Sequence, residues 1–224
     1  MSVTPLEIQA NRLDLLSRLA GDISHEIKNP LHAMVINLEL VRRRVEKGER
    51  EGALERVAIV EQEVAKVHGL THALIEALRP PREVDTVSVP ARVVEEIVPL
   101  LAARARLARV DFSAEPGADA VRVDLSPHLL RQALLNLFDR GVRAAGVGGT
   151  VRLELDFDER MVSITIADSG VAPEPYLPEA EQEPVGLRFA HALAVTAGGE
   201  VIVQSGEEPL RARVILRLPR TGSA

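Results

Sequence analysis

The stretch LDLLSRLAGDISHEIKNPLHAMVINLELVRRRV, residues 13–45, decides how the first part of the chain folds. Apolar residues recur in it at steps of three and four, with one seven-residue interval across Pro30. The residues of this series are Leu13, Leu16, Ala20, Ile23, Ile27, Met34, Leu38, Val41 and Val45. Because an α-helix repeats every ~3.6 residues, the spacing predicts a long amphipathic helix with one apolar strip.

A second apolar series begins after KGEREG, residues 47–52, which interrupts the pattern with glycine and charge. Its members are Val57, Val60, Val64, Val67, Thr71, Leu74 and Leu78. Two long helices joined by a short turn form an antiparallel hairpin. Each helix offers only one narrow apolar strip, so the hairpin cannot enclose a core by itself. We therefore expect a homodimer in which two hairpins form a four-helix bundle.

The proline-rich stretch RPPREVDTVSVP, residues 79–90, separates the hairpin from a region that mixes helix and strand periods. Helices are expected over 91–105, 126–145 and 185–199, with Ser126 as the N-cap of the second. Strands are expected over 108–114, 121–125, 151–157, 161–168, 200–205 and 211–219. The chain is thus predicted to be α+β, with a helical hairpin (1–80), a linker (81–90) and an α/β sandwich (91–224). We expect the helices of the sandwich to cover one face of a mostly antiparallel sheet.

Composition narrows the class of protein. No apolar run approaches the roughly 18 residues that cross a bilayer, and the N-terminus lacks the features of a signal peptide. The absence of cysteine excludes disulfides and thiolate metal sites, and it fits the cytosol. A net charge of −6, one tyrosine and four phenylalanines offer no basic stripe or stacking surface for nucleic acid. We expect a cytoplasmic protein without a membrane or nucleic-acid partner.

His25 lies off the apolar strip of the first helix. A helix advances about 100° per residue, so His25 lies about 200° from Ile23 and from Ile27. Asn29 lies one turn further on the same face, and Glu26 stands next to His25. An exposed imidazole is a competent nucleophile, and a neighbouring carboxylate can act as its base. The HExxH pattern of zinc proteases is excluded, because an asparagine replaces its second histidine.

The segment GDISHEIKNPLHAM, residues 21–34, closely resembles the H-box of two-component sensor histidine kinases. An acidic residue, an asparagine and a proline follow the histidine in the register of that family. The layout of a long hairpin followed by a sandwich is also similar to this family, from about Leu13 to Pro219. The resemblance implies that His25 carries a phosphoryl group.

The residues around His25 take their roles from the same resemblance. Glu26 would act as a base or hold the imidazole tautomer, and Asn29 would position a water that dephosphorylates the partner. Lys28 and His32 share the exposed face with His25. We expect the receiver domain of a response regulator to dock on this face, with Lys28 attracting its acyl phosphate.

The ATP site of this family is built from three sequence boxes, and each box is altered in this chain. The first should read N-x-x-x-N-A, and its second asparagine binds Mg²⁺; this chain keeps Asn136 but has Arg140 at that second position. Arginine has only donors and repels a cation. The second box should read D-x-G-x-G. Asp168 and Gly170 match it, and Ala172 replaces the second glycine.

The third box should read G-x-G-L after a mobile, glycine-rich lid. Gly186 matches the first glycine, and Arg188 replaces the second. The preceding stretch VAPEPYLPEAEQEPV, residues 171–185, is rich in proline and glutamate, and the glutamates would repel a triphosphate. A fold that is kept while its ligand site is altered is typical of a pseudokinase.

We therefore expect a phosphorelay protein that takes a phosphoryl group onto His25 from the aspartate of one receiver domain and passes it to another. This histidine phosphotransferase would need no cofactor and no metal, and an upstream kinase or hybrid kinase would supply the phosphoryl group. Two alternatives stay open: an ATP-dependent histidine kinase that phosphorylates His25 itself, and a non-catalytic dimeric scaffold that binds a response regulator. His68 and His72 share a helix face without an evident third metal ligand.

Overall fold

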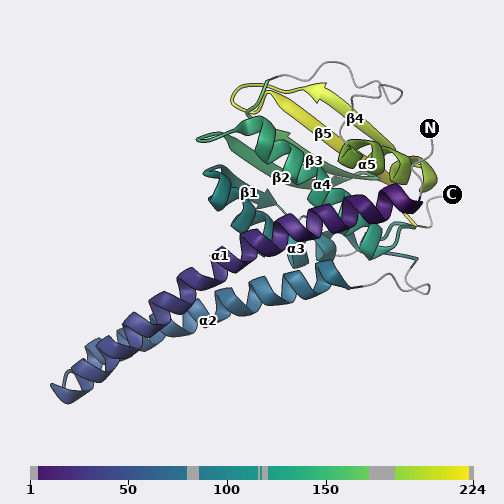
Figure 1. The fold of residues 1–224 in the computed structure, drawn as a ribbon. Coiled ribbons are helices and arrows are strands. Elements are labelled where there is room, and N and C mark those ends of the chain that lie inside the picture. The colour runs from purple at the N-terminus through teal and green to yellow at the C-terminus, as the bar shows by residue number, and fades with distance from the viewer. Residues whose placement is uncertain (1–4, 80–85, 116, 118–120, 172–184, 222–224) are drawn as a thin grey trace.

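A helical hairpin and an α/β domain make up the fold in the computed structural model, which describes residues 5–79, 86–115, 117, 121–171 and 185–221. Helix α1 (Pro5–Glu46) and helix α2 (Arg50–Leu78) run side by side, and the end of this hairpin that carries the turn projects away from the rest of the chain (Figure 1). The predicted hairpin is confirmed. At its turn Gly48 has a φ of 75°, a left-handed conformation that favours glycine. Within the described ranges, none of the helices combines the length and the apolar character that crossing a bilayer needs.

Three helices and five strands follow in the described part of the chain. They are α3 (Pro90–Ala108), β1 (Asp111–Glu115), α4 (Pro127–Ala145), β2 (Thr150–Phe157), β3 (Met161–Asp168), α5 (Val185–Thr196), β4 (Glu200–Ser205) and β5 (Ala212–Pro219). The strands form one sheet in the order β1-β2-β3-β5-β4. Strand β1 pairs parallel with β2, and the other neighbours pair antiparallel. The predicted α+β class with a mostly antiparallel sheet is confirmed.

Residues 121–125 do not form the strand that their sequence predicts. Val123 makes isolated bridges to Ser88 and to Arg220, and within the described residues the segment has no longer ladder. Alternate residues of the segment are nevertheless buried, which reproduces the pattern of a strand with one covered face. The pattern therefore reports which side chains face the core, and a strand also needs a neighbouring backbone to pair with.

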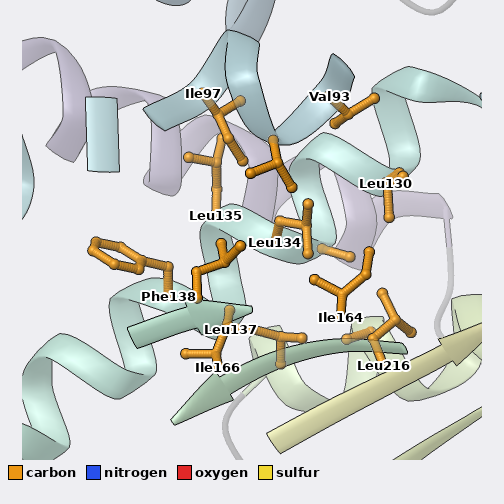
Figure 2. Packing of buried hydrophobic residues seen from close by; sticks show 14 of the residues in the cluster. Val93, Ile97, Leu130, Leu134, Leu135, Leu137, Phe138, Ile164, Ile166 and Leu216 are labelled. Atoms are coloured by element: carbon orange, nitrogen blue, oxygen red, sulfur yellow. The ribbon is translucent and has the colours of Figure 1, made fainter. Parts of the chain in front are cut away.

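The core of the α/β domain lies between the sheet and the helices that cover one of its faces. Along β5, alternate residues are buried, as expected for a strand with one face against the core. Figure 2 shows the side chains that meet there: Leu130, Leu134, Leu135, Leu137 and Phe138 of α4, Ile164 and Ile166 of β3, Leu216 of β5, and Val93 and Ile97 of α3. Helix α4 begins at Pro127 after Ser126, whose hydroxyl makes no capping hydrogen bond with the described residues.

The first half of α1 packs on this α/β domain. Leu15, Leu19 and Ile23 are buried in the same apolar cluster as residues of α3, α4 and α5. Figure 1 shows this purple part of α1 lying across the domain toward α5. The predicted apolar strip is displaced here, because Leu13 and Ala20 are exposed. The helix turns toward the α/β domain a face next to the one that heptad spacing selects.

Candidate functional site

The outer face of α1 carries His25. Its side chain is exposed, whereas Ile23, two residues earlier, is buried. Lys28, Asn29 and His32 are exposed as well, so the structure brings together the residues that the sequence placed on one face. The Nδ1 atom of His32 lies 3.2 Å from the carbonyl oxygen of Lys28. Exposure leaves the imidazole of His25 accessible to a phosphoryl donor or acceptor.

The carboxylate next to His25 is held by the α/β domain. Arg106 of α3 donates two hydrogen bonds to Oε2 of Glu26, from Nη2 at 2.6 Å and from Nε at 2.8 Å. The Glu26 side chain is only 11% exposed, and that of Arg106 is 59% exposed. The sequence carries no signal for this pair, because its members are 80 residues apart and Arg106 belongs to no motif. The expected base of His25 is therefore already engaged in this arrangement.

A groove of about 740 Å³ lies beside this ion pair, between the hairpin and α3. Its walls include Glu26 and Asn29 of α1, Lys66 of α2, and Pro99 and Arg106 of α3. Side chains do not fill this space, so contact between the hairpin and α3 is incomplete at the level of His25. Separation of α3 from α1 would therefore cost little apolar burial here.

Asn136 of α4 is bonded to the first helix. Its Nδ2 donates to Oδ1 of Asn11 at 2.8 Å, and Nδ2 of Asn11 donates back to Oδ1 of Asn136 at 3.1 Å. Gln132, one turn earlier in α4, also donates to Oδ1 of Asn11, at 3.2 Å. The Asn136 amide is buried, so these contacts take the place of water. Sequence reasoning missed Asn11 and Gln132, since neither lies in a recognisable box.

Asp168 stands at the end of β3 with a fully buried side chain. Its Oδ1 accepts a hydrogen bond from the Gly170 N–H at 2.9 Å. Its Oδ2 lies 3.5 Å from Nη1 of Arg140 and has no hydrogen-bond partner within the described residues. Burial raises the pKa of Asp168, and the Gly170 N–H and the Arg140 charge oppose that rise. The end of β3 thus presents a buried carboxylate with one acceptor unused.

Gly186 and Gly170, which match glycines in the family's boxes, lie so close to neighbouring atoms that a side chain does not fit at either position. A Cβ at Gly186 would lie 2.9 Å from Cβ of Asn136, and a Cβ at Gly170 would lie 2.6 Å from the carbonyl oxygen of Ala144. Both distances are far inside ordinary contact, so a side chain at either position would force backbone or neighbouring atoms to move. The start of α5, the end of β3 and α4 therefore meet around Asn136 and Asp168.

These residues fit an adenine nucleotide, and they do not fit a magnesium ion at the family's position. Asp168 Oδ2 is a buried acceptor that an amino group can satisfy. Arg140 presents only donors where the family has an oxygen ligand. The oxygen of the Asn136 amide is already bonded to Asn11. In this arrangement Arg140 and Asn136 of α4 therefore do not serve as metal ligands in the reaction.

The other candidates that the sequence singled out are Arg188, Ala172, His68 and His72. Arg188 is partly buried on α5, and Ala172 falls outside the described residues. The rings of His68 and His72 on α2 stack with centroids 6.4 Å apart. Across the described ranges, no three His, Cys, Asp or Glu side chains gather in a metal-binding arrangement.

Comparison with known proteins identifies two domains. Residues 15–79 match the family "His Kinase A (phospho-acceptor) domain", and residues 126–222 match the family "Histidine kinase-, DNA gyrase B-, and HSP90-like ATPase". The adaptive-response sensory kinase SasA of Synechococcus sp. (strain JA-3-3Ab) is 28% identical over 183 residues, 77% of this chain and 46% of that protein. The signal transduction histidine-protein kinase AtoS of Escherichia coli is 29% identical over 164 residues, 72% of this chain and 26% of that protein. The chain thus spans less than half the length of these relatives.

Solved structures show the same fold. A histidine kinase from Burkholderia phymatum superposes with a TM-score of 0.52 at 15% identity, covering 98% of this chain and all of that chain. The catalytic domain of the histidine kinase ThkA superposes with a TM-score of 0.54 at 20% identity, covering 60% of this chain and 95% of that domain. The first likeness spans the hairpin and the α/β domain together.

The expectation of a phosphotransferase that does not use ATP is wrong. The ATPase family matches straight through the altered boxes, and the matched relatives are sensor kinases, which favours the ATP-dependent alternative. The physical reason is that the substitutions leave key contacts in place, since Asp168 keeps a free acceptor and Gly186 keeps its close approach to Asn136. With a phospho-acceptor hairpin joined to an ATPase domain of this type, the chain belongs to the two-component histidine kinase family.

Proposed function

We propose that the protein is the core of an ATP-dependent histidine kinase that phosphorylates itself on His25. One observation carries the proposal: the chain combines an exposed His25 beside a carboxylate with a buried Asp168 oxygen that lacks a partner among the described residues. The first supplies a nucleophile and its base. The second supplies an acceptor for the amino group of adenine.

The chemistry at His25 is a phosphoryl transfer. The unprotonated ring nitrogen of His25 attacks the γ-phosphorus of ATP, and an N–P bond forms as the bond from that phosphorus to the bridging oxygen breaks. ADP leaves with the electron pair of the broken bond. Glu26 accepts the proton of the other ring nitrogen, so the product is a neutral phosphoimidazole ring. Replacing Glu26 with glutamine should slow the transfer by about 10²-fold.

The nucleotide would be bound by residues from three elements of the α/β domain. Asp168 accepts from the adenine amino group, and Asn136 forms one wall with Gly170 and Gly186. The guanidinium of Arg188 supplies positive charge for the phosphates in place of the glycine that the family has there.

The described arrangement precedes transfer. Asn136 is bonded to Asn11, and Glu26 is bonded to Arg106. Both the nucleotide wall and the base are thus held by contacts between α1 and the α/β domain. For transfer, the domain leaves this position, which releases the two groups together. Little packed surface is lost at the groove beside Glu26, whereas Leu15, Leu19 and Ile23 would lose the cover of the α/β domain.

The hairpin would act as a homodimer. We assign residues 1–80 to this dimerising hairpin, 81–90 to a linker and 91–224 to the nucleotide-binding domain. Apolar side chains away from the domain stand exposed on the single chain: Leu31, Val35, Ile36, Leu38, Val45, Leu54, Val64 and Ile75. A second hairpin would bury them in a four-helix bundle.

The phosphoryl group would then pass to a response regulator. Its receiver domain docks on the face of His25, where Lys28 and His32 are exposed and Lys28 attracts the acyl phosphate. Asn29 positions a water on the same face, so Asn29→Ala should mainly reduce dephosphorylation of the receiver.

A labelling experiment tests the proposal. The purified protein is incubated with Mg²⁺ and ATP that carries a label on its γ-phosphate, and the label on the protein is followed over time. The parent should take up acid-labile label, and His25→Ala should take up none. His32→Ala, on the same exposed face, is the matched control and should be labelled like the parent. Absence of label on the parent, or equal label on His25→Ala, would contradict the proposal.

A further inference from the structure

Arg140 stands where the family has a metal-binding asparagine, yet its side chain does not extend into solvent. It is 21% exposed, and its Nη1 atom is buried beside the fully buried Asp168. A guanidinium has donors only, so this residue cannot take over the role of the asparagine. At this position the chain therefore has a guanidinium group that is directed toward Asp168.

Two buried atoms without hydrogen-bond partners face each other at this point. Nη1 of Arg140 and Oδ2 of Asp168 form an ion pair at 3.5 Å, and neither has a hydrogen-bond partner among the described residues. The two charges attract at this distance, but the geometry is not that of a hydrogen bond. A buried polar atom left unsatisfied is unfavourable, so a pair of them side by side calls for a third group.

The pair offers one donor next to one acceptor. The edge of adenine that carries its amino group has the complementary order, with the amino donor beside the ring nitrogen N1. An Asp168 carboxylate is acceptor-only while it is ionised. Arg140 favours that ionised form, because its positive charge opposes the effect of burial. The charge of Arg140 thus favours the acceptor-only form of Asp168 that such an edge requires.

We propose that Arg140 and Asp168 together read the base of the nucleotide, with Nη1 of Arg140 donating to N1 of adenine and Oδ2 of Asp168 accepting from its amino group. This inference rests on the proposed function, since it takes ATP as the ligand. It makes Arg140 a specificity-determining residue at the position where the family places a metal ligand. The hydrogen bond to N1 forms without a divalent cation.

Nucleotide analogues test the two hydrogen bonds one at a time. Dissociation constants are measured by calorimetry in the presence of EDTA for ATP, for 1-deaza-ATP, in which C–H replaces N1, and for purine riboside triphosphate, which lacks the amino group. The parent should bind each analogue about tenfold more weakly than ATP. Arg140→Met should bind ATP and 1-deaza-ATP equally, because the donor to N1 is gone, and it should still discriminate against purine riboside triphosphate.

Arg143→Met is the matched control. Arg143 lies on the same helix and pairs with Asp139, with a side chain that is 58% exposed. This variant should keep the full discrimination of the parent. If the parent binds ATP and 1-deaza-ATP equally, the inference is overturned while the proposed function stands. If neither ATP nor an analogue binds, either in EDTA or with Mg²⁺, the proposed function is overturned and the inference with it. The comparison of analogues on the parent does not depend on any variant folding.

Discussion

The two halves of α1 differ in what covers their apolar side chains. In the first half, Leu15, Leu19 and Ile23 are 5% exposed or less, because the α/β domain of the same chain covers them. In the second half, Val35 and Leu38 are 67% and 54% exposed on the single chain. One helix thus has a partner within its own chain over one half, and over the other half an apolar face that a second chain would cover.

This difference shows what a periodic pattern can and cannot specify. Apolar residues at steps of three and four create a strip that any apolar surface can cover. The α/β domain takes the strip near residue 19, and the strip further along stays free. Which surface covers the apolar strip depends on the domain that follows in the chain. The sequence of the helix itself does not contain that information.

A charge in the covered half should have the largest effect. Ile23 is 2% exposed in the shared core, so Ile23→Asp buries a carboxylate without a partner. We expect the free energy of unfolding to fall by about 3 kcal/mol or more. Urea unfolding followed by circular dichroism measures this change. Val147→Asp, in an exposed turn, is the control and should change it by less than about 0.5 kcal/mol.

A charge in the free half should act on assembly instead. In the proposed dimer, Leu38→Glu places a carboxylate in each copy against the other hairpin. Losing the burial of two leucines alone corresponds to about 3 kcal/mol, or roughly a hundredfold weaker association. Sedimentation or light scattering over a range of concentrations measures it. A parent that is monomeric at micromolar concentration would refute the dimer, and unchanged association of Leu38→Glu would exclude this face as the interface.

Acid should lower the stability of the fold through His128, which lies at the start of α4 within electrostatic range of Arg12 in the covered half. Burial, together with the charges of Arg12 and Arg131, lowers the pKa of His128 to about 4. As the pH falls from about 6.5 toward 4, the unfolded chain takes up a proton that the folded chain does not, so stability decreases over that interval. Above about pH 6.5 this contribution is constant.

The check compares urea midpoints at pH 7 and pH 5. In His128→Gln the midpoint should depend less on pH than in the parent. His72→Gln, an exposed change on α2, should leave the pH dependence of the parent intact. Equal pH dependence of the parent and His128→Gln would show that the protonation of His128 does not oppose folding.

The smallest effect should come from the hydrogen-bonded amides of Asn11, near the start of α1, and Asn136 of α4. Asn11→Ala removes the group that occupies Asn136, so ATP no longer competes with α1 for that amide. One such hydrogen bond is worth about 1 kcal/mol, so ATP should bind about fivefold more tightly. Calorimetry measures this, and Gln9→Ala, exposed on the same helix, should bind ATP like the parent. Unchanged affinity of Asn11→Ala would mean that ATP and Asn11 do not compete.

Local periodicity was enough to predict most of the secondary structure and the exposed face of His25. The strands β2, β3 and β5 follow from alternation, and the position of His25 follows from its angle to Ile23. Residues 121–125 were mistaken for a strand, because burial alternates there without a paired neighbour. Alternation reports burial, and pairing depends on residues far along the chain.

The proposed nucleotide site was interpreted one residue at a time from the sequence. Its properties depend on contacts between residues that are far apart in the chain. Arg140 looked like the loss of a metal ligand, whereas its position against Asp168 is visible only in the folded chain. Asn11 and Asn136 are separated by 125 residues, so no local pattern connects them. The same holds for Arg106 and Glu26. These interactions depend on how the hairpin docks, which no local pattern in the sequence encodes.

Arg12 gives the docked turn of α1 a second attachment. Its Nη2 donates to the carbonyl oxygens of Leu78 and Arg79, each at 3.0 Å, where α2 ends and the chain leaves for the α/β domain. The neighbouring Asn11 touches the nucleotide wall. One turn of α1 therefore contacts both the exit of the hairpin and the catalytic domain. A rotation of α1 by one residue, about 100°, would break both contacts at once. Movement of this turn would therefore act on the exit of the hairpin and on the α/β domain together, without involving the tip of the hairpin.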